Sequence, residues 1–219
     1  KLIRTQYMDT LINRSRASHL LIPGINGNIQ AVSRFVESGW YFDDPSFVVN
    51  LSPKEQKDWF VDFMGLSIEK LNHLTIRRLA ESKPPEIEIT ASYLVSGQAS
   101  VSGSRMFIPL DFSRKASPVK PDSSHVSPFK IDWSTVNSDT LNYIIPDGYK
   151  IEYLPEAVSF SSEFGSYQTS ISKTDTSFTF VRKIVFQEGK HDAAKFNLLA
   201  AFLNKTIKAE QTKAILIQK

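Results

Sequence analysis

The chain has 219 residues, a formal net charge of +3 at neutral pH, 41% hydrophobic and 22% charged residues, and no cysteine. Such a composition is typical of a folded domain with a substantial apolar core, and the small charge favours neither a nucleic-acid nor a membrane partner. No apolar run approaches the length of a membrane span. The missing cysteine excludes disulfides, thiolate zinc sites and a cysteine nucleophile. Because the chain begins KLIRTQ, with neither an initiator Met nor a signal peptide, we expect it to be a mature or excised fragment.

The first predicted element is a β-hairpin. Two apolar runs flank Asn26 and Gly27, the pair that favours a type I′ turn because both central residues need a positive φ. The second run is expected to end near Gly39. A turn signal, Asp44-Pro45, follows it.

The first helix is predicted over residues 53–64. Ser52 suits the N-cap position, Glu55 completes a capping box three residues later, and Gly65 supplies the stop. Large apolar residues recur at helical spacing, so one face of this helix is expected to pack against the core. These residues are Trp59, Phe60, Phe63 and Met64.

The stretch VSGQASVSGSRMFIPL, residues 95–110, raises the question of a catalytic loop. A P-loop needs four residues between its glycines and a lysine after the second, whereas five residues separate Gly97 from Gly103 and Ser104 follows. A nucleophile elbow needs Gly-x-Ser-x-Gly, which is also missing. Residues 86–95 alternate like a half-buried strand, so we interpret the stretch as a hairpin or bulge joining two strands.

Residues 113–128 are rich in proline and serine and lack periodicity, which predicts a long surface loop or a linker between lobes. The chain is therefore expected to form one unit or two lobes, residues 17–112 and 129–219. Beyond the loop, short β-type runs alternate with turn signals, and a second helix is predicted over residues 193–208 before a final strand. This pattern predicts a mainly β fold, an antiparallel β-sandwich-like architecture with two packed α-helices.

The histidines give no metal-binding pattern. His19, His73, His125 and His191 lie far apart in the sequence, so no local ligand spacing exists, and we expect no metal or other cofactor. A Ser-His-Asp triad has no support either, because scattered residues of these types occur in any chain of this size. The sequence therefore predicts no catalytic residue and no enzymatic activity.

Charged clusters are interpreted as solvated surface. Glu86 and Glu88 share the outer face of one predicted strand, and Asp43-Asp44 is assigned to a turn. Without interleaved aromatic residues or a recognition helix, the basic pairs are also read as solvated strand faces rather than as a nucleic-acid site. These pairs are Arg77-Arg78, Arg114-Lys115 and Arg182-Lys183.

One aromatic cluster supports a more specific hypothesis. The segment GWYFDDP places Trp40, Tyr41 and Phe42 beside acidic and turn residues, similar to a sugar-stacking platform on a β-sandwich. Trp40 and Tyr41 are thus candidate residues for binding a glycan or peptide. The alternative, which we favour, is that two of the three rings fill the core.

The last third of the sequence carries a family resemblance. Its segments IPDGYKIEYLP, FGSYQTSIS, VRKIVFQEGKHDAAKFNLLAAFLNK and AILIQK resemble the C-terminal β-rich domain of unknown function found downstream of transglutaminase-like cores in secreted bacterial proteins. Upstream, NGNIQAVSRFVESG, LSPKEQKDWF and ASVSGSRMFIPLDF are similar to the preceding strands and helix of that family. The resemblance spans the chain from about Asn26.

The resemblance implies a parent protein with a papain-like core, a Cys-His-Asp triad, the label of putative protease, and export to the periplasm or outer surface. Because this chain has no cysteine, no triad residue carries over to it. We expect a non-catalytic accessory domain that docks on, orients or limits access to that core, so its partners would be other domains of the parent chain. The alternative is a glycan- or peptide-binding module, and a free-standing hydrolase is the least favoured reading.

Overall fold

The computed structural model describes residues 9–79, 82–112, 118–122, 124 and 126–219. His125 and the pair Arg114-Lys115 lie outside these residues. The described chain forms a mainly β domain of 14 strands in three sheets, with three α-helices and two short 3₁₀ helices. This confirms the predicted fold class.

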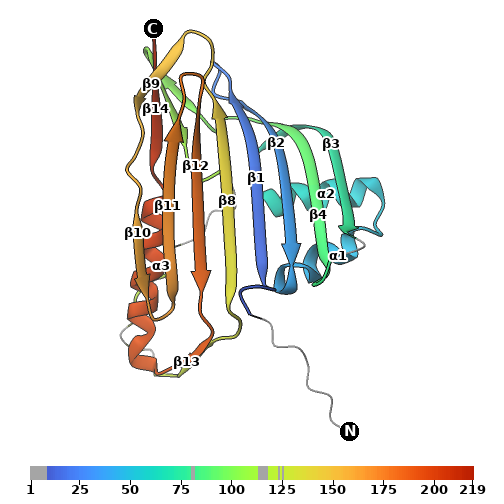
Figure 1. The fold of residues 1–219 in the computed structure, drawn as a ribbon, viewed down its shortest axis with the longest axis vertical. Coiled ribbons are helices and arrows are strands. Elements are labelled where there is room, and N and C mark those ends of the chain that lie inside the picture. The colour runs from blue at the N-terminus through green and yellow to red at the C-terminus, as the bar shows by residue number, and fades with distance from the viewer. Residues whose placement is uncertain (1–8, 80–81, 113–117, 123, 125) are drawn as a thin grey trace.

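Eight strands form the main sheet (Figure 1). They are β1 (Arg14–Pro23), β2 (Ile29–Ser38), β3 (Ile68–Leu79), β4 (Glu86–Val95), β8 (Thr135–Ile144), β10 (Ser159–Ser162), β11 (Gly165–Lys173) and β12 (Ser177–Phe186). Their order is β10-β11-β12-β8-β1-β2-β4-β3. The two halves of the chain meet where β1 and β8 pair in parallel, whereas every other strand pair in the described residues is antiparallel. Both predicted lobes therefore contribute to one continuous sheet.

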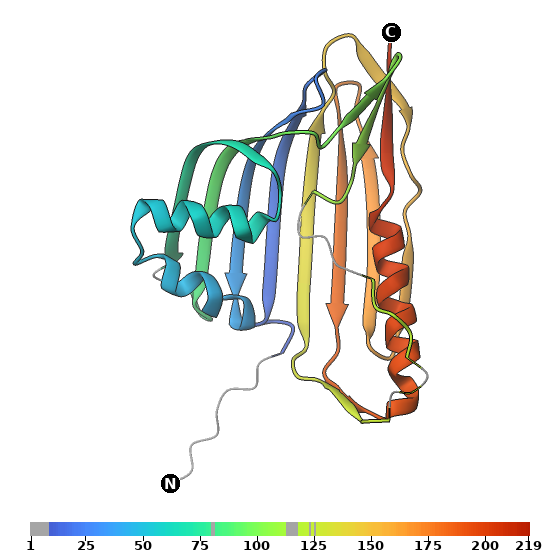
Figure 2. The ribbon, with the colours of Figure 1, turned by 180° about the vertical axis from the view of Figure 1, so that it is seen from behind.

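The remaining elements lie on one face of the main sheet, which we call the inner face (Figure 2). They include a four-stranded sheet and a two-stranded sheet. The four-stranded sheet has the order β5-β6-β14-β9, from β5 (Ser100–Ser102), β6 (Arg105–Pro109), β9 (Tyr149–Tyr153) and β14 (Lys213–Gln218), and the two-stranded sheet pairs β7 (Phe129–Ile131) with β13 (Gly189–His191). The four-stranded sheet covers part of the inner face, which gives the sandwich-like arrangement.

The helices cover the two ends of the inner face. The chain passes from η1 (Gly39–Tyr41) into α1 (Asp43–Val48) and α2 (Pro53–Met64), which lie over β1–β4. Near the C-terminus, η2 (Ala193–Lys195) leads into α3 (Phe196–Glu210) over β10–β12. Helix α1 was not predicted, and Asp43 and Asp44 form its first turn rather than a connecting turn. Acidic residues suit this position because the helix dipole is positive there.

Local sequence signals explain the ends of α2. The Ser52 side chain accepts from the Glu55 backbone N–H, and the Glu55 carboxylate accepts from the Ser52 N–H at 2.9 Å, which completes the predicted capping box. Gly65 ends the helix with φ +59, a left-handed conformation that glycine adopts without steric cost. The predicted helix over residues 53–64 is confirmed.

The hairpin of β1 and β2 is also confirmed, but its turn differs from the prediction. The Gly27 N–H donates to the Gly24 carbonyl, and Gly27 has φ +83. Asn26 does not have the positive φ that a type I′ turn requires. Residues 24–28 therefore form a longer connection in which only Gly27 adopts a positive φ.

The stretch 95–110 contains a hairpin, although not the one between the two strands that were predicted. β4 ends at Val95 in the main sheet, whereas β5 and β6 form a tight hairpin in the four-stranded sheet, with Gly103 at φ +58 between them. β6 then pairs with β14, more than 100 residues further along the chain. The Gly/Ser string is a connection between sheets.

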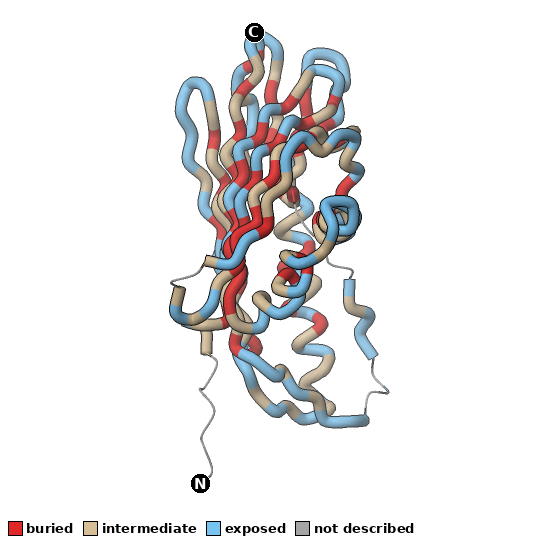
Figure 3. The backbone as a smooth tube through the Cα atoms, turned by 90° about the vertical axis from the view of Figure 1, so that its right-hand side faces the viewer, coloured by how far each residue is buried: buried red, intermediate tan, exposed pale blue. Residues whose placement is uncertain are grey.

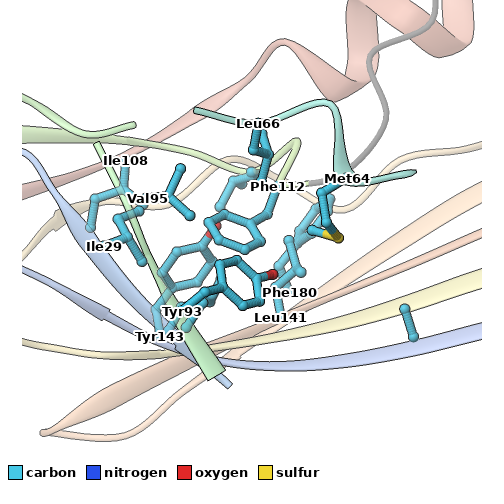
Figure 4. Close-up of a cluster of buried hydrophobic side chains, with 14 of the residues drawn as sticks. Ile29, Met64, Leu66, Tyr93, Val95, Ile108, Phe112, Leu141, Tyr143 and Phe180 are labelled. Atoms are coloured by element: carbon cyan, nitrogen blue, oxygen red, sulfur yellow. The ribbon is translucent and has the colours of Figure 1, made fainter. Parts of the chain in front are cut away.

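A hydrophobic core lies between the inner face and the four-stranded sheet, α1 and α2. Figure 3 marks the buried residues along the backbone in red. Figure 4 shows how Tyr93 and Tyr143 of the main sheet meet Ile108 of β6 and Met64 of α2 in one cluster. The Tyr143 hydroxyl donates to the Pro109 carbonyl at 2.8 Å, which ties the two large sheets together. This core therefore joins the main sheet to α1, α2 and the four-stranded sheet, whereas the buried residues of α3 lie outside the cluster.

Candidate functional site

The outer face of the main sheet carries an exposed apolar patch, and no described helix or second sheet covers this face (Figure 1). We define the outer patch as Leu20 and Ile22 of β1, Val32 of β2 and Leu94 of β4. Val32 is 55% exposed, and Leu20 and Ile22 are 40% and 42% exposed. The patch lines a hollow of about 330 Å³. Contiguous exposed apolar surface of this kind is typical of interaction sites.

An ion-pair ladder borders the outer patch on the same face. Arg34 Nε donates to Glu88 at 2.7 Å, Arg77 Nε donates to the other oxygen of Glu88 at 2.6 Å, and Arg16 pairs with Glu86. Burial opposes ionisation of Glu88, but the hydrogen bonds from Arg77 and Arg34 outweigh it and hold the pKa of this carboxyl below its usual value. Glu88 is therefore not the solvated residue that the sequence predicted: its residue exposure is 5%.

A buried charge network lies on the inner face at the opposite side of the sheet. Arg182 of β12 pairs with Asp139 of β8 and with Glu210 at the end of α3, and it donates to Asn137 Oδ1 at 2.8 Å. The side chains of Arg182, Asp139 and Glu210 are 17%, 8% and 13% exposed. Arg182 is thus largely shielded from solvent and ion-paired, which corrects its prediction as part of a solvated strand face.

Burial and neighbouring charge act against each other on Glu210. Burial raises the pKa of this carboxyl and the Asp139 carboxylate raises it further, while Arg182 lowers it without restoring the usual value. Burial also opposes the charge on Arg182, but Asp139 and Glu210 outweigh this effect and raise the guanidinium pKa. Arg182 therefore stays charged and holds both acids.

A groove of about 240 Å³, which we call the inner groove, opens beside this network between α3 and the main sheet. Ile184 and Phe186 of β12 and Leu203 and Ile207 of α3 form its apolar walls, and Arg182 and Glu210 lie at one end. Its lining also includes Tyr41 of η1. The groove thus combines apolar walls with a charged end, as small-ligand sites commonly do.

The two residues of the predicted platform are placed differently. Trp40 is 56% exposed and lies against Trp133, which is 40% exposed, with ring centroids 6.4 Å apart and planes inclined by 31°. Tyr41 is half-buried and lines the groove. No pattern in the sequence indicates that Trp133, 93 residues further along, would lie against Trp40. A platform role for Trp40 and Tyr41 stays a prediction.

His19 lies in the core next to the charge network. Its Nδ1 is 2.7 Å from Ser33 Oγ, which lies 2.8 Å from the Tyr93 hydroxyl. Burial, the largest influence, lowers the His19 pKa to about 4; Asp139 acts in the opposite direction and Arg182 in the same direction. The imidazole is therefore neutral near pH 7 and serves as a packed core residue.

Nothing in the described ranges forms a group of three or more His, Asp or Glu residues able to hold a metal ion. The helices in these ranges are all too short or too polar to cross a membrane. His73 is exposed on β3, and His191 is the last residue of β13, shortly before η2.

These features define a mainly β domain with one bare apolar sheet face and one inner groove. The family model described as a domain of unknown function with a solved structure (DUF3858) matches residues 104–216, just over half of the 219 residues. The chain belongs to this family. The match begins at the β5–β6 turn and ends within β14, so the family domain supplies half of the strands of the main sheet and the lining of the groove apart from Tyr41. No curated protein matches the sequence.

Proposed function

We propose that this chain is a non-catalytic accessory domain that docks, through the outer patch, on another folded domain of the same polypeptide. The outer patch is the observation that supports the proposal most directly. Aliphatic side chains at the centre of a bare sheet face are costly to leave in water, and their burial would contribute about 25 cal/mol per Å² of apolar area.

The ion-pair ladder supports the same proposal because it resembles the polar rim of an interface. Apolar residues at the centre with charged residues around them are the usual arrangement at protein–protein contacts. The arginines Arg16, Arg34 and Arg77 remain partly exposed, with 44%, 55% and 64% of their side-chain surfaces accessible. Their guanidinium groups can therefore contact a partner while they hold Glu86 and Glu88.

The family resemblance suggests what the partner is. Proteins that resemble this chain carry a transglutaminase-like, papain-like core, so we propose that such a core is the domain that covers the outer patch. On the same resemblance, we propose that the parent protein is exported to the periplasm or the outside of the cell. This chain cannot supply the cysteine nucleophile of such a core, because it contains no cysteine.

Binding in trans tests the proposal. The 219-residue chain is titrated with the remainder of its polypeptide, and the double variant Leu20→Ser/Val32→Thr is compared with Leu198→Ser, which removes an exposed apolar residue from α3. We expect the outer-face variant to weaken binding by about tenfold or more, because central apolar contacts dominate interface energies. Equal affinities would contradict the proposal, and so would a chain that instead forms a dimer through the outer patch.

A second candidate function is supported by the exposed Trp40–Trp133 pair. Two accessible indole rings beside Tyr41 suit a glycan- or peptide-binding module, since aromatic rings stack on sugar and side-chain surfaces. Glycan and peptide arrays probed with the chain and with Trp40→Ala and Tyr41→Ala test this function. Selective binding that both variants lose, with unchanged melting temperatures, would favour it over docking.

A further inference from the structure

The lining of the inner groove changes from apolar to charged in the same direction along β12 and along α3. On β12, Phe186 and Ile184 precede Arg182 when the strand is followed backwards; on α3, Leu203 and Ile207 precede Glu210 when the helix is followed forwards. The contacts of Phe186 with Phe202 and of Arg182 with Glu210 show that these two directions coincide. The groove therefore has an apolar end and a charged end.

Arg182 and Glu210 line the charged end, and Asp139, which pairs with Arg182 but does not line the groove, gives the network behind it more acidic than basic groups. Asp139 and Glu210 are two carboxylates around one guanidinium, that of Arg182, and when ionised they leave one formal negative charge in excess. Arg182 already donates to both carboxylates and to Asn137. An anionic ligand would meet the Glu210 carboxylate and the excess negative charge of the network, whereas a cation would neutralise that excess.

A buried hydroxyl beside the network also lacks a hydrogen-bond partner. Tyr167 of β11 is fully buried, and its phenol oxygen has no partner in the described part of the chain. Glu210, Arg182 and Asp139 all act on this group electrostatically, which places the hydroxyl within reach of the same network. Buried polar atoms are normally satisfied, so an unpaired one near the charge network indicates a place for a polar ligand group or a water molecule.

We propose that the inner groove binds a basic side chain, lysine or arginine, presented by a peptide segment. The aliphatic stem would lie along Ile184, Leu203 and Ile207, and the cationic head would reach the Glu210 carboxylate. A stem with one terminal positive charge matches the order of the groove, apolar first and acidic last. This inference is independent of docking through the outer patch, because the two sites lie on opposite faces of the sheet.

Titration of the 219-residue chain with three probes tests the inference. The probes are Nα-acetyl-lysine amide, which keeps the charged side-chain ammonium, Nα-acetyl-norleucine amide, which keeps the stem without the charge, and Nα-acetyl-glutamate amide. Methyl NMR signals of Ile184, Leu203 and Ile207 report occupancy of the groove. We expect the lysine compound to bind about tenfold or more tightly than the norleucine compound, as a charge-assisted hydrogen bond would give. An arginine compound that binds as tightly as the lysine compound supports the same inference.

Substitution at the charged end provides the matched test. Glu210→Gln keeps the shape and removes the charge, so the preference for lysine over norleucine should fall by about tenfold. Lys208→Gln, an exposed change on the same helix, should leave it unaltered. Equal binding of the three probes, tightest binding of the glutamate compound, or no binding in the groove would overturn the inference. The comparison of probes on the unsubstituted chain decides the matter even where the Glu210 variant fails to fold.

Discussion

The buried imidazole of His19 should make the protein sensitive to acid. His19 is 3% exposed, one ring nitrogen contacts Ser33, and Nε2 has no partner among the described residues. Protonation would place a positive charge among Phe35 and Phe112, whose rings lie 5.3 Å and 5.7 Å from the imidazole. The folded protein therefore resists protonation, and the His19 pKa falls from 6.5 to about 4.

The size of the effect follows from this pKa difference. The unfolded chain takes up a proton as the pH falls below 6.5, whereas the folded chain does so only near pH 4. Each pKa unit is equivalent to about 1.4 kcal/mol, so the folded state should lose about 3 kcal/mol through His19 alone. Between these two pH values the unfolded state binds more protons than the folded state, so the free energy of unfolding decreases as the pH is lowered. The contribution of His19 is present in full well above pH 6.5.

Urea unfolding of the wild-type chain and of His19→Gln, at about pH 7.5 and about pH 4, measures this contribution. Other titrating groups change stability in both proteins, so the difference between the two profiles isolates His19. The wild-type protein should lose about 3 kcal/mol more than the variant between the two pH values. Parallel profiles would refute the reasoning and mean that the folded structure accommodates a charged His19.

Two further substitutions test the core and the charge network by urea unfolding. Phe60→Ala should lower the free energy of unfolding by about 3–5 kcal/mol, because this ring of α2 is fully buried. Lys57→Ala, on the exposed side of the same helix, should be nearly neutral. Similar losses of stability in the two variants would mean that α2 packs through another face. Arg182→Met should cost about 3–5 kcal/mol because it leaves buried carboxylates without their partner, whereas Lys183→Met on the next residue should change little. A mild effect at Arg182 would show that the network is hydrated.

Local signals predicted the elements that short-range chemistry determines. The capping box and Gly65 gave both ends of α2, and the alternation of β4 identified a half-buried strand. On α3, the buried apolar side consists of Ala200, Phe202 and Ile207. Helical periodicity locates an apolar face, while the neighbouring strands decide its centre.

These local signals could not predict which strands pair when they are far apart in the sequence. The parallel pairing of β1 with β8 and the pairing of β6 with β14 join segments more than 100 residues apart, and each strand looks the same in sequence whichever partner it takes. The charge network was missed for the same reason, because Asp139 lies 43 residues from Arg182. An Arg-Lys pair in a strand is usually solvated, and only the position of α3 covers the arginine.

Thiol footprinting tests the docking proposal most directly, because the chain has no cysteine of its own. Val32→Cys places a thiol in the outer patch and Leu198→Cys places one on α3, and both parent residues are more than half exposed. Maleimide labelling rates are measured by mass spectrometry of the peptides concerned, in the isolated chain and in the complete polypeptide. The proposal predicts similar rates at the two sites in the isolated chain and about tenfold or greater protection of Cys at position 32 alone in the complete polypeptide. Equal labelling of both sites in the complete polypeptide would contradict it.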